Sequence, residues 1–284
     1  MISIEGTYDL HVHAAPSIAR RRFTALEALK QASEEKMGGF LLLDHTYNTA
    51  MVAEVLNGLG YETRVFGSIL LNEAVGGLNP GIVEVALAQG TKQIQMPTYS
   101  SKHHQLLYGD DQKIFPYKKR AKPAFILDEH GRLTPEVEEI IQLVKESESF
   151  LGTGHLSLEE IQALVGRAKE VKCKVLVNSV STDMIDLPVD VQKTLADEHI
   201  FIEHDYMAVT DVPHRPMPIE SVVEQIHAVG PERCVIGTDA GLLFVPDMIS
   251  GMKKFISGLL ENGLTDRELD FIARTNPRIL LGIS

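Results

Sequence analysis

The sequence has little cysteine and no long apolar run. Its two cysteines, Cys173 and Cys234, are too few for a disulfide framework or a cysteine-based zinc site, so we expect both to be core residues. No stretch approaches the roughly 18 apolar residues that a membrane span needs. The opening residues MISIEGTYDL lack the basic and apolar regions of a signal peptide. These absences lead us to expect a cytoplasmic protein that does not contact membranes.

Basic residues are also in short supply. The chain has 27 Lys and Arg against 39 Asp and Glu, which gives a net charge of −12. This balance argues against nucleic acid as a partner and favours a small molecule. The hydrophobic fraction of 44% in 284 residues is enough for a sizeable core, so disorder is not expected. Self-association is compatible with the sequence, but no pattern in it indicates a homo-oligomer.

Short apolar runs rich in β-formers recur along the chain and alternate with segments of helical apolar spacing. Near-continuous apolar runs are typical of strands in a parallel sheet that is covered on both faces. The eight runs lie at 7–13, 39–45, 64–71, 91–98, 149–155, 174–180, 200–206 and 234–240. Eight such units in this length predict a (β/α)8 TIM barrel, a single domain over residues 1–284.

Three features refine this fold prediction. A doubly wound open sheet is the rival, but no G-x-G-x-x-G follows the first run. Residues 99–133 are too long for a simple connection, so we expect an excursion with a small hairpin after the fourth strand. Ser157 with Glu160 and Thr265 with Glu268 read as capping boxes, and Thr134-Pro135 as a capped helix start.

The stretch YDLHVHAAPS (8–17) places two histidines one residue apart where the first strand ends. Residues two apart in a strand point to the same face, so His11 and His13 point together. Active sites of TIM barrels lie at the carboxyl ends of the strands. We therefore expect both imidazoles to bind a metal ion at that mouth.

Titratable residues also end several of the other strands, where a core would favour aliphatic side chains. They are Asp44 and His45 on the second, His155 on the fifth, Glu203 and His204 on the seventh, and Asp239 on the eighth. Several histidines with one carboxylate form a ligand set suited to zinc, with manganese or iron as alternatives. For His45, a role in supporting the ligands or the substrate is an equal alternative.

DLHVH on the first strand, GTGH on the fifth, EH on the seventh and GTDAG on the eighth resemble the amidohydrolase superfamily of metal-dependent TIM barrels. GPERCVIGTDAG and NPRILLG, near the end of the chain, strengthen the likeness, which is to a cytosolic, uncharacterised branch. The resemblance implies that His11, His13, His155 and Asp239 are metal ligands and that Asp239 handles protons.

The chain departs from that superfamily at two strands. The sixth strand ends in Val177-Asn178-Ser179-Val180 without a histidine, and the fourth ends in Gln95-Met96-Pro97-Thr98 without a bridging Lys or Glu. We therefore expect one ion rather than two, with His204 as a further ligand or as a catalytic group beside Asp239. A weaker resemblance, from DLHVH and LLLDHT, is to phosphoesterases of the polymerase and histidinol phosphatase type.

The predicted activity is hydrolysis by metal-activated water of an amide, lactone or ester-type bond. Non-oxidative decarboxylation and a non-catalytic barrel that binds a metal or metabolite remain alternatives. Two basic clusters and a histidine pair are candidates for binding an anionic substrate. They are Arg20 to Arg22, of which Arg20 and Arg22 are singled out, Lys118 to Arg120, and His103 with His104, alongside His45.

Overall fold

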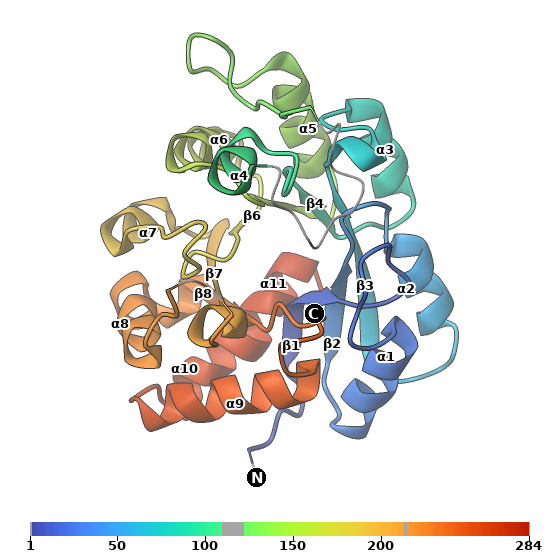
Figure 1. Ribbon diagram of the computed structural model, residues 1–284, viewed down its shortest axis with the longest axis vertical. Helices are drawn as coiled ribbons and strands as arrows, with labels where there is room; N and C mark the ends of the chain where they lie inside the picture. The colour runs from blue at the N-terminus through green and yellow to red at the C-terminus, as the bar shows by residue number, and fades with distance from the viewer. Residues whose placement is uncertain (1, 110–121, 213–214, 284) are drawn as a thin grey trace.

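The computed structural model describes residues 2–109, 122–212 and 215–283. One parallel sheet runs through it in the order β1 to β8, and each of the eight predicted runs contains one strand. The helices surround the strands (Figure 1). The strands are β1 Tyr8–His13, β2 Gly39–Leu43, β3 Arg64–Leu70, β4 Gln93–Gln95, β5 Phe150–Gly152, β6 Val175–Val177, β7 Ile200–Asp205 and β8 Cys234–Gly237.

The sheet closes on itself between its first and last strands. Val12 of β1 forms a parallel bridge with Ala240, just after β8, and the His13 amide donates to the Ala240 carbonyl at 2.8 Å. Each strand also pairs with its neighbours in sequence. The predicted (β/α)8 barrel is therefore confirmed.

Eleven α-helices are assigned among the described residues, and they connect the strands or extend the loops. The two predicted capping boxes, at Ser157 and Thr265, are both present. Pro135 does begin a helix, but the Thr134 side chain makes no capping hydrogen bond, so that part of the prediction was wrong. The helices are α1 Ala25–Glu34, α2 Ala50–Asn57, α3 Pro80–Ala88, α4 Lys102–Tyr108, α5 Pro135–Lys145, α6 Leu158–Val171, α7 Val189–Leu195, α8 Ile219–Val229, α9 Met248–Glu261, α10 Asp266–Asp270 and α11 Asn276–Leu281.

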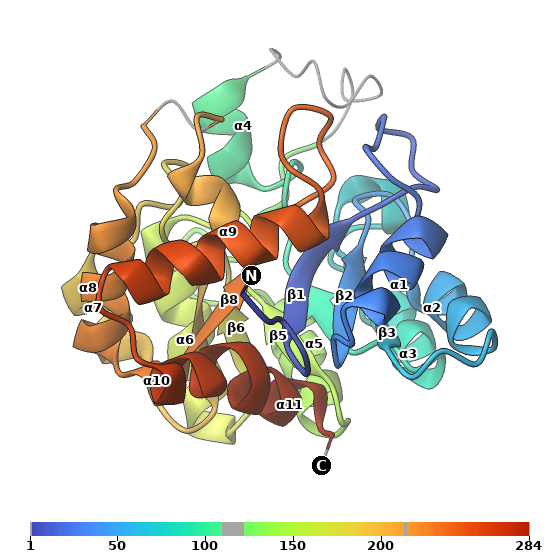
Figure 2. The same cartoon turned by 90° about the horizontal axis from the view of Figure 1, so that it is seen from below.

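The core has two parts, one outside the barrel and one inside it. Side chains such as Ile200 and Ile202 pack outward against the helices. Leu10, Phe150 and Phe201 fill the lower barrel interior together with Leu280 of α11. Figure 2 shows α10 and α11 at one end of the molecule and α4 at the other. The apolar packing therefore closes the amino-terminal end of the barrel, and the opposite mouth is available for a site.

The excursion after β4 contains the expected hairpin and one helix that the sequence did not predict. Leu127 and Leu133 form an antiparallel bridge around a turn at Asp128, while α4 begins at Lys102. The cluster Lys118 to Arg120 lies outside the described residues. Both cysteines are buried, as expected. Within the part of the chain that is described, no helix combines the length and apolarity of a membrane span.

Candidate active site

A cavity of about 990 Å³ opens at the carboxyl ends of the strands. His11, His13 and Asp239 lie at its polar end. Its wall is largely apolar and includes Met207 and Phe244, from the loops that follow β7 and β8. This volume is in the range of pockets that enclose small-molecule ligands.

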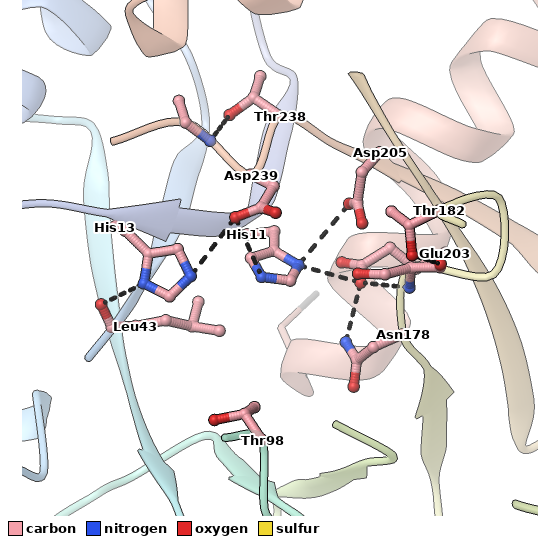
Figure 3. Close-up of polar contacts among 12 residues, drawn as sticks. His11, His13, Leu43, Thr98, Asn178, Thr182, Glu203, Asp205, Thr238 and Asp239 are labelled. Atoms are coloured by element: carbon pink, nitrogen blue, oxygen red, sulfur yellow. Dashed lines mark hydrogen bonds and ion pairs between the residues drawn. The ribbon is translucent and has the colours of Figure 1, made fainter. Parts of the chain in front are cut away.

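Two histidines and one aspartate converge there (Figure 3). His11 Nε2 lies 3.6 Å and His13 Nε2 lies 3.5 Å from the same oxygen, Asp239 Oδ1. The three ligand atoms lie within 4.8 Å of one another. The pairing register of β1 shifts between Asp9 and Val12, so Leu10 faces the lower core while the next residue, His11, also faces the barrel interior.

Hydrogen bonds to the other ring nitrogen orient both imidazoles. His13 Nδ1 lies 3.1 Å from the Leu43 carbonyl oxygen, which only accepts, so this nitrogen carries the hydrogen. His11 Nδ1 lies 3.2 Å from Glu203 Oε2. Both rings therefore turn Nε2 toward Asp239, which is the arrangement that a metal-binding histidine needs.

Two further carboxylates lie beneath this group. Glu203 and Asp205 are fully buried, and Asp205 Oδ1 is 3.7 Å from His11 Nδ1. A methyl group on Gly237 would lie 3.0 Å from that Asp205 oxygen, so the inward-facing glycine leaves room for the acidic pair. Glu203 Oε1 is buried with no hydrogen-bond partner in the described part of the chain.

The clustered acids change the protonation of the site. Burial lowers the pKa of His11, but Asp239, Glu203 and Asp205 outweigh burial and raise the pKa well above its usual range. Burial, and then Glu203, raise the pKa of Asp205 well above normal. Burial also raises the pKa of Asp239, with His11 and then Arg21 acting in the opposite direction. The buried carboxylates therefore concentrate negative charge here, and neutral imidazoles would not offset it.

A divalent cation fits these residues. Two imidazole nitrogens and one carboxylate oxygen form the donor set of catalytic zinc sites and of several iron sites. A dication would offset the excess acidic charge that otherwise holds protons. The unpartnered Glu203 oxygen also indicates a polar centre that the protein's own donors do not complete.

Asp239 is held in an unusual backbone conformation by its neighbours. Its φ is +49°, in the left-handed region that a residue with a side chain rarely adopts. Just before it, the Thr238 hydroxyl donates to Asp9 Oδ2 at 2.6 Å, and the Thr238 amide donates to Asp9 Oδ1 at 3.0 Å. Burial raises the pKa of Asp9 to about 7. Asp9 thus joins β1 to the end of β8 beside the candidate ligands.

The prediction that His204 reaches the site is wrong. Its strand alternates, so Phe201, Glu203 and Asp205 face the barrel interior while His204 faces the helices. His204 is fully buried, and its Nδ1 lies 2.7 Å from the Ser181 hydroxyl. Burial lowers its pKa to about 3, so the ring is neutral at physiological pH. His204 is a packing residue.

His155 lies in the cavity wall but apart from the candidate ligands. His155 Nδ1 is 2.8 Å from Nδ1 of His104 in α4, and the two rings are stacked. Among the described residues, two groups of ligand atoms converge, His11 with His13 and Asp239, and His11 with Glu203 and Asp205. His155 belongs to neither. His155 therefore lines the cavity beside His104 and does not join His11, His13 and Asp239.

Of the residues predicted to bind substrate, His45 lies in the cavity wall, stacked on His13 with ring centroids 4.9 Å apart. His103 instead bonds the Met184 carbonyl through Nε2 at 3.1 Å, and its neighbour His104 lines the cavity. Of the predicted pair, His104 rather than His103 therefore faces the cavity.

The arginine cluster shows a similar shift. Arg20 and Arg22 are exposed, and Arg22 donates to the Leu243 carbonyl at 3.0 Å, tying the loop after β1 to the loop after β8. Arg21 is the residue that lines the cavity, with Nη2 3.5 Å from His13 Nδ1. Of the three arginines it is Arg21, not the predicted Arg20 or Arg22, that lines the cavity, because in this irregular loop the middle residue turns inward.

Comparison with known proteins places the chain in a family. A family model described as "Family of unknown function (DUF6282)" matches residues 6–203, which include β1 to most of β7. The chain belongs to this family. The family description assigns no activity, and no curated protein matches the chain.

Several solved structures are similar to this family member in fold. An amidohydrolase from Pseudomonas aeruginosa has a TM-score of 0.66 at 13% identity and covers 97% of this chain and 95% of its own. A dipeptidase described as a metallo peptidase has a TM-score of 0.63 at 10% identity, covering 99% of both chains. A 2,6-dihydroxybenzoate decarboxylase from Rhizobium has a TM-score of 0.54 at 11% identity, covering 98% and 99%. These likenesses confirm the resemblance to the amidohydrolase superfamily in fold.

Proposed function

We propose that this protein is a metal-dependent hydrolase of the amidohydrolase type with one divalent ion, zinc or, as alternatives, manganese or iron. The observation that carries the proposal is the convergence of His11 Nε2 and His13 Nε2 on one Asp239 oxygen at the cavity floor. The metallo peptidase among the similar structures supports the chemistry class. The resemblance also implied His155 as a ligand, but its position beside His104 favours contact with substrate.

His11, His13 and Asp239 would hold a dication, which when bound would lower the pKa of water from 15.7 to about 7 and stabilise the charge that develops on a carbonyl oxygen. Asp239 accepts the proton of the attacking water and passes it to the leaving group. Its raised pKa brings this carboxylate closer to the pH at which it exchanges protons efficiently. His11 and His13 act as oriented ligands.

The substrate is a small molecule with an anionic group. Among the described residues that line the cavity, Arg21 is the one with a basic Lys or Arg side chain, and it lies next to His13. A guanidinium binds a carboxylate or phosphate through paired hydrogen bonds. Leu242, Phe244 and Val209 supply an apolar wall that suits the rest of the molecule. An amide, lactone or ester-type bond next to the candidate ligands would be cleaved.

Non-oxidative decarboxylation is the second candidate. It is favoured by the similarity to the Rhizobium decarboxylase and by the cationic Arg21 beside the candidate ligands, where a substrate carboxylate would be held. Both reactions need the same ligands, so the product separates them. Hydrolysis consumes water and releases a leaving group, whereas decarboxylation releases carbon dioxide.

Elemental analysis and a substrate panel test the proposal. We expect about one metal ion per chain, and turnover of at least one amide, lactone, ester or phosphoester. Asp239→Asn, assayed at saturating metal, is expected to lose 100- to 10,000-fold in turnover, the range for loss of a general base. Asp190→Asn, at an exposed position in α7, is the matched control and is expected to behave as wild type.

Bound metal with no turnover across the panel, and no release of carbon dioxide from carboxylic acids, would contradict an enzyme and favour a binding protein. Two ions per chain would contradict the single-ion site. Absence of metal after loading with zinc, manganese and iron would overturn the proposed function as a whole.

A further inference from the structure

We propose that Asn178 and Glu203 are positioning residues that hold the His11 ring with Nε2 toward Asp239. Asn178 lies at the end of β6, where the superfamily commonly has a histidine ligand, and here its amide orients a ligand instead of being one. The inference rests on the proposed function in so far as His11 Nε2 binds the ion. The orientation itself can be tested without a metal.

Glu203 forms the centre of the arrangement because one of its oxygens accepts three hydrogen bonds. Oε2 lies 2.8 Å from Asn178 Nδ2, 3.2 Å from the Ser179 amide nitrogen and 3.2 Å from His11 Nδ1. The Glu203 side chain is fully buried, so water does not compete for these contacts. With Asn178 and Ser179 fixing Oε2, this oxygen sets the direction of the His11 ring.

Asn178 is itself fixed at both ends of its amide. While Nδ2 donates to Glu203, Oδ1 accepts from the Gly154 amide at 3.2 Å, and the Asn178 backbone amide donates to Thr153 Oγ1 at 2.9 Å. Turning the amide over would set Oδ1 against the Glu203 carboxylate and Nδ2 against a backbone N–H. Both losses disfavour the turned form, so Asn178 has one orientation.

The packing around Asn178 also depends on a small residue in the neighbouring strand. A methyl group on Gly152 of β5 would lie 2.7 Å from Asn178 Oδ1. The glycine thus provides the space in which the amide lies. The chain of contacts then runs from β5 through Asn178, just after β6, and Glu203 in β7 to His11 in β1.

This chain of contacts has one consequence for His11 and one for Asn178. A carboxylate that accepts the hydrogen of the far ring nitrogen keeps the ring in one orientation and makes the near nitrogen a stronger ligand. The contacts with Glu203 and Gly154 also occupy both polar ends of the Asn178 amide, so Asn178 offers no ligand to a second ion. Loss of such an outer contact typically weakens metal affinity by 10- to 100-fold.

The test measures zinc affinity by chelator competition for four variants of the full chain. Glu203→Ala removes the acceptor and is expected to weaken zinc binding 10- to 100-fold. Glu203→Gln keeps an oxygen that accepts from His11, so we expect a smaller loss of zinc affinity in this variant. The zinc affinity of Asn178→Ala is expected to lie between those of the two Glu203 variants. His204→Ala, on the same strand and equally buried but facing the helices, is the matched control and is expected to stay within about twofold of wild type.

Crystal structures of metal-free wild type and Glu203→Ala form the second arm. We expect His11 Nδ1 to stay on Glu203 in wild type and the ring to rotate or occupy two positions in the variant. If wild type binds no metal but this difference is seen, the proposed function fails and the positioning role stands. Wild-type zinc affinity together with an unmoved ring in Glu203→Ala would overturn the inference, as would an equal loss of affinity in His204→Ala.

Discussion

At the residue scale, neighbouring side chains on β7 have opposite roles. Glu203 faces the barrel interior and contacts His11, while His204, the next residue, is buried among the helices against Ser181. An acidic side chain in the interior is useful only beside cations or donors. A neutral imidazole on the outer face only has to fill space and make its hydrogen bond. The burial of the neutral His204 ring makes the free energy of unfolding depend on pH.

His204 makes stability depend on pH in a defined direction. Burial lowers its folded-state pKa to about 3, against about 6.5 in the unfolded chain. Below pH 6.5 the unfolded chain takes up a proton that the folded protein does not, so stability falls as the pH falls toward 3. At pH 5.5, one unit below the unfolded value, the loss is about 1.4 kcal/mol.

Urea unfolding at pH 7.5 and 5.5 checks this effect, with a chelator present so that metal ligands contribute equally to both proteins. His204→Asn removes the titrating ring but keeps a polar side chain. We expect the variant to lose about 1.4 kcal/mol less than wild type between the two pH values. An identical loss in both proteins would show that His204 titrates normally and is not sealed from water.

At the element scale, the sequence was sufficient to predict the strands but not which side chains at their ends reach the site. Near-continuous apolar runs located all eight strands, and the two-residue repeat of a strand correctly placed His11 and His13 on one face. The same rule applied to IFIEHD indicates that Phe201, Glu203 and Asp205 share one face and that His204 lies on the other. Preference for histidine as a ligand, rather than missing information, led to the choice of His204.

Loops are where prediction failed for physical reasons. Arg20 to Arg22 lie in an irregular loop, and His103 with His104 lies in α4, a short helix that the sequence did not predict. Nothing in the sequence therefore distinguishes Arg21 from Arg20, or His104 from His103. The backbone path decides which side chain turns inward. Asp9 could have been noticed as a carboxylate inside an apolar strand, a position that requires partners. Its partner Thr238 is 229 residues away and gives no local signal.

The terminal helix α11 seals the lower end of the barrel, and its contribution can be measured. Leu280 is fully buried in the inner cluster with Leu10 and Phe150. Leu280→Ala is expected to lower the free energy of unfolding by about 2–5 kcal/mol, the range for a buried leucine. Zinc affinity should not change, because the packing lies at the far end from the candidate ligands.

Ile279→Ala is the control for this helix. Ile279 is adjacent in sequence but 46% exposed, so its removal is expected to cost no more than about 0.5 kcal/mol in chemical denaturation. Equal effects at the two positions would mean that α11 does not seal the barrel as described.

At the scale of the whole molecule, an ion bound only by the folded state stabilises the entire barrel. At a free metal concentration of 100 times the dissociation constant, the gain is about 2.7 kcal/mol. For a chain of this size that corresponds to a rise of roughly 5 °C in the melting midpoint. Differential scanning calorimetry with and without zinc should show this rise, and a chelator should reverse it.

Asp239→Asn provides the comparison, since it removes one of three ligands without altering the apolar core. Its melting midpoint is expected to respond much less to zinc. A wild-type midpoint that is indifferent to zinc, manganese and iron alike would show that the three side chains do not form a metal site.

The closing seam of the barrel joins residues that lie far apart in the sequence. His11 and His13 precede Asp239 by more than 200 residues, and Asp239 lies next to the bridge between Val12 and Ala240. A nascent chain on the ribosome therefore carries the two histidines without Asp239 until the end of β8 has been synthesised. The candidate ligand set is complete only once the seam closes, so a chain truncated before β8 is expected to bind no ion at this site.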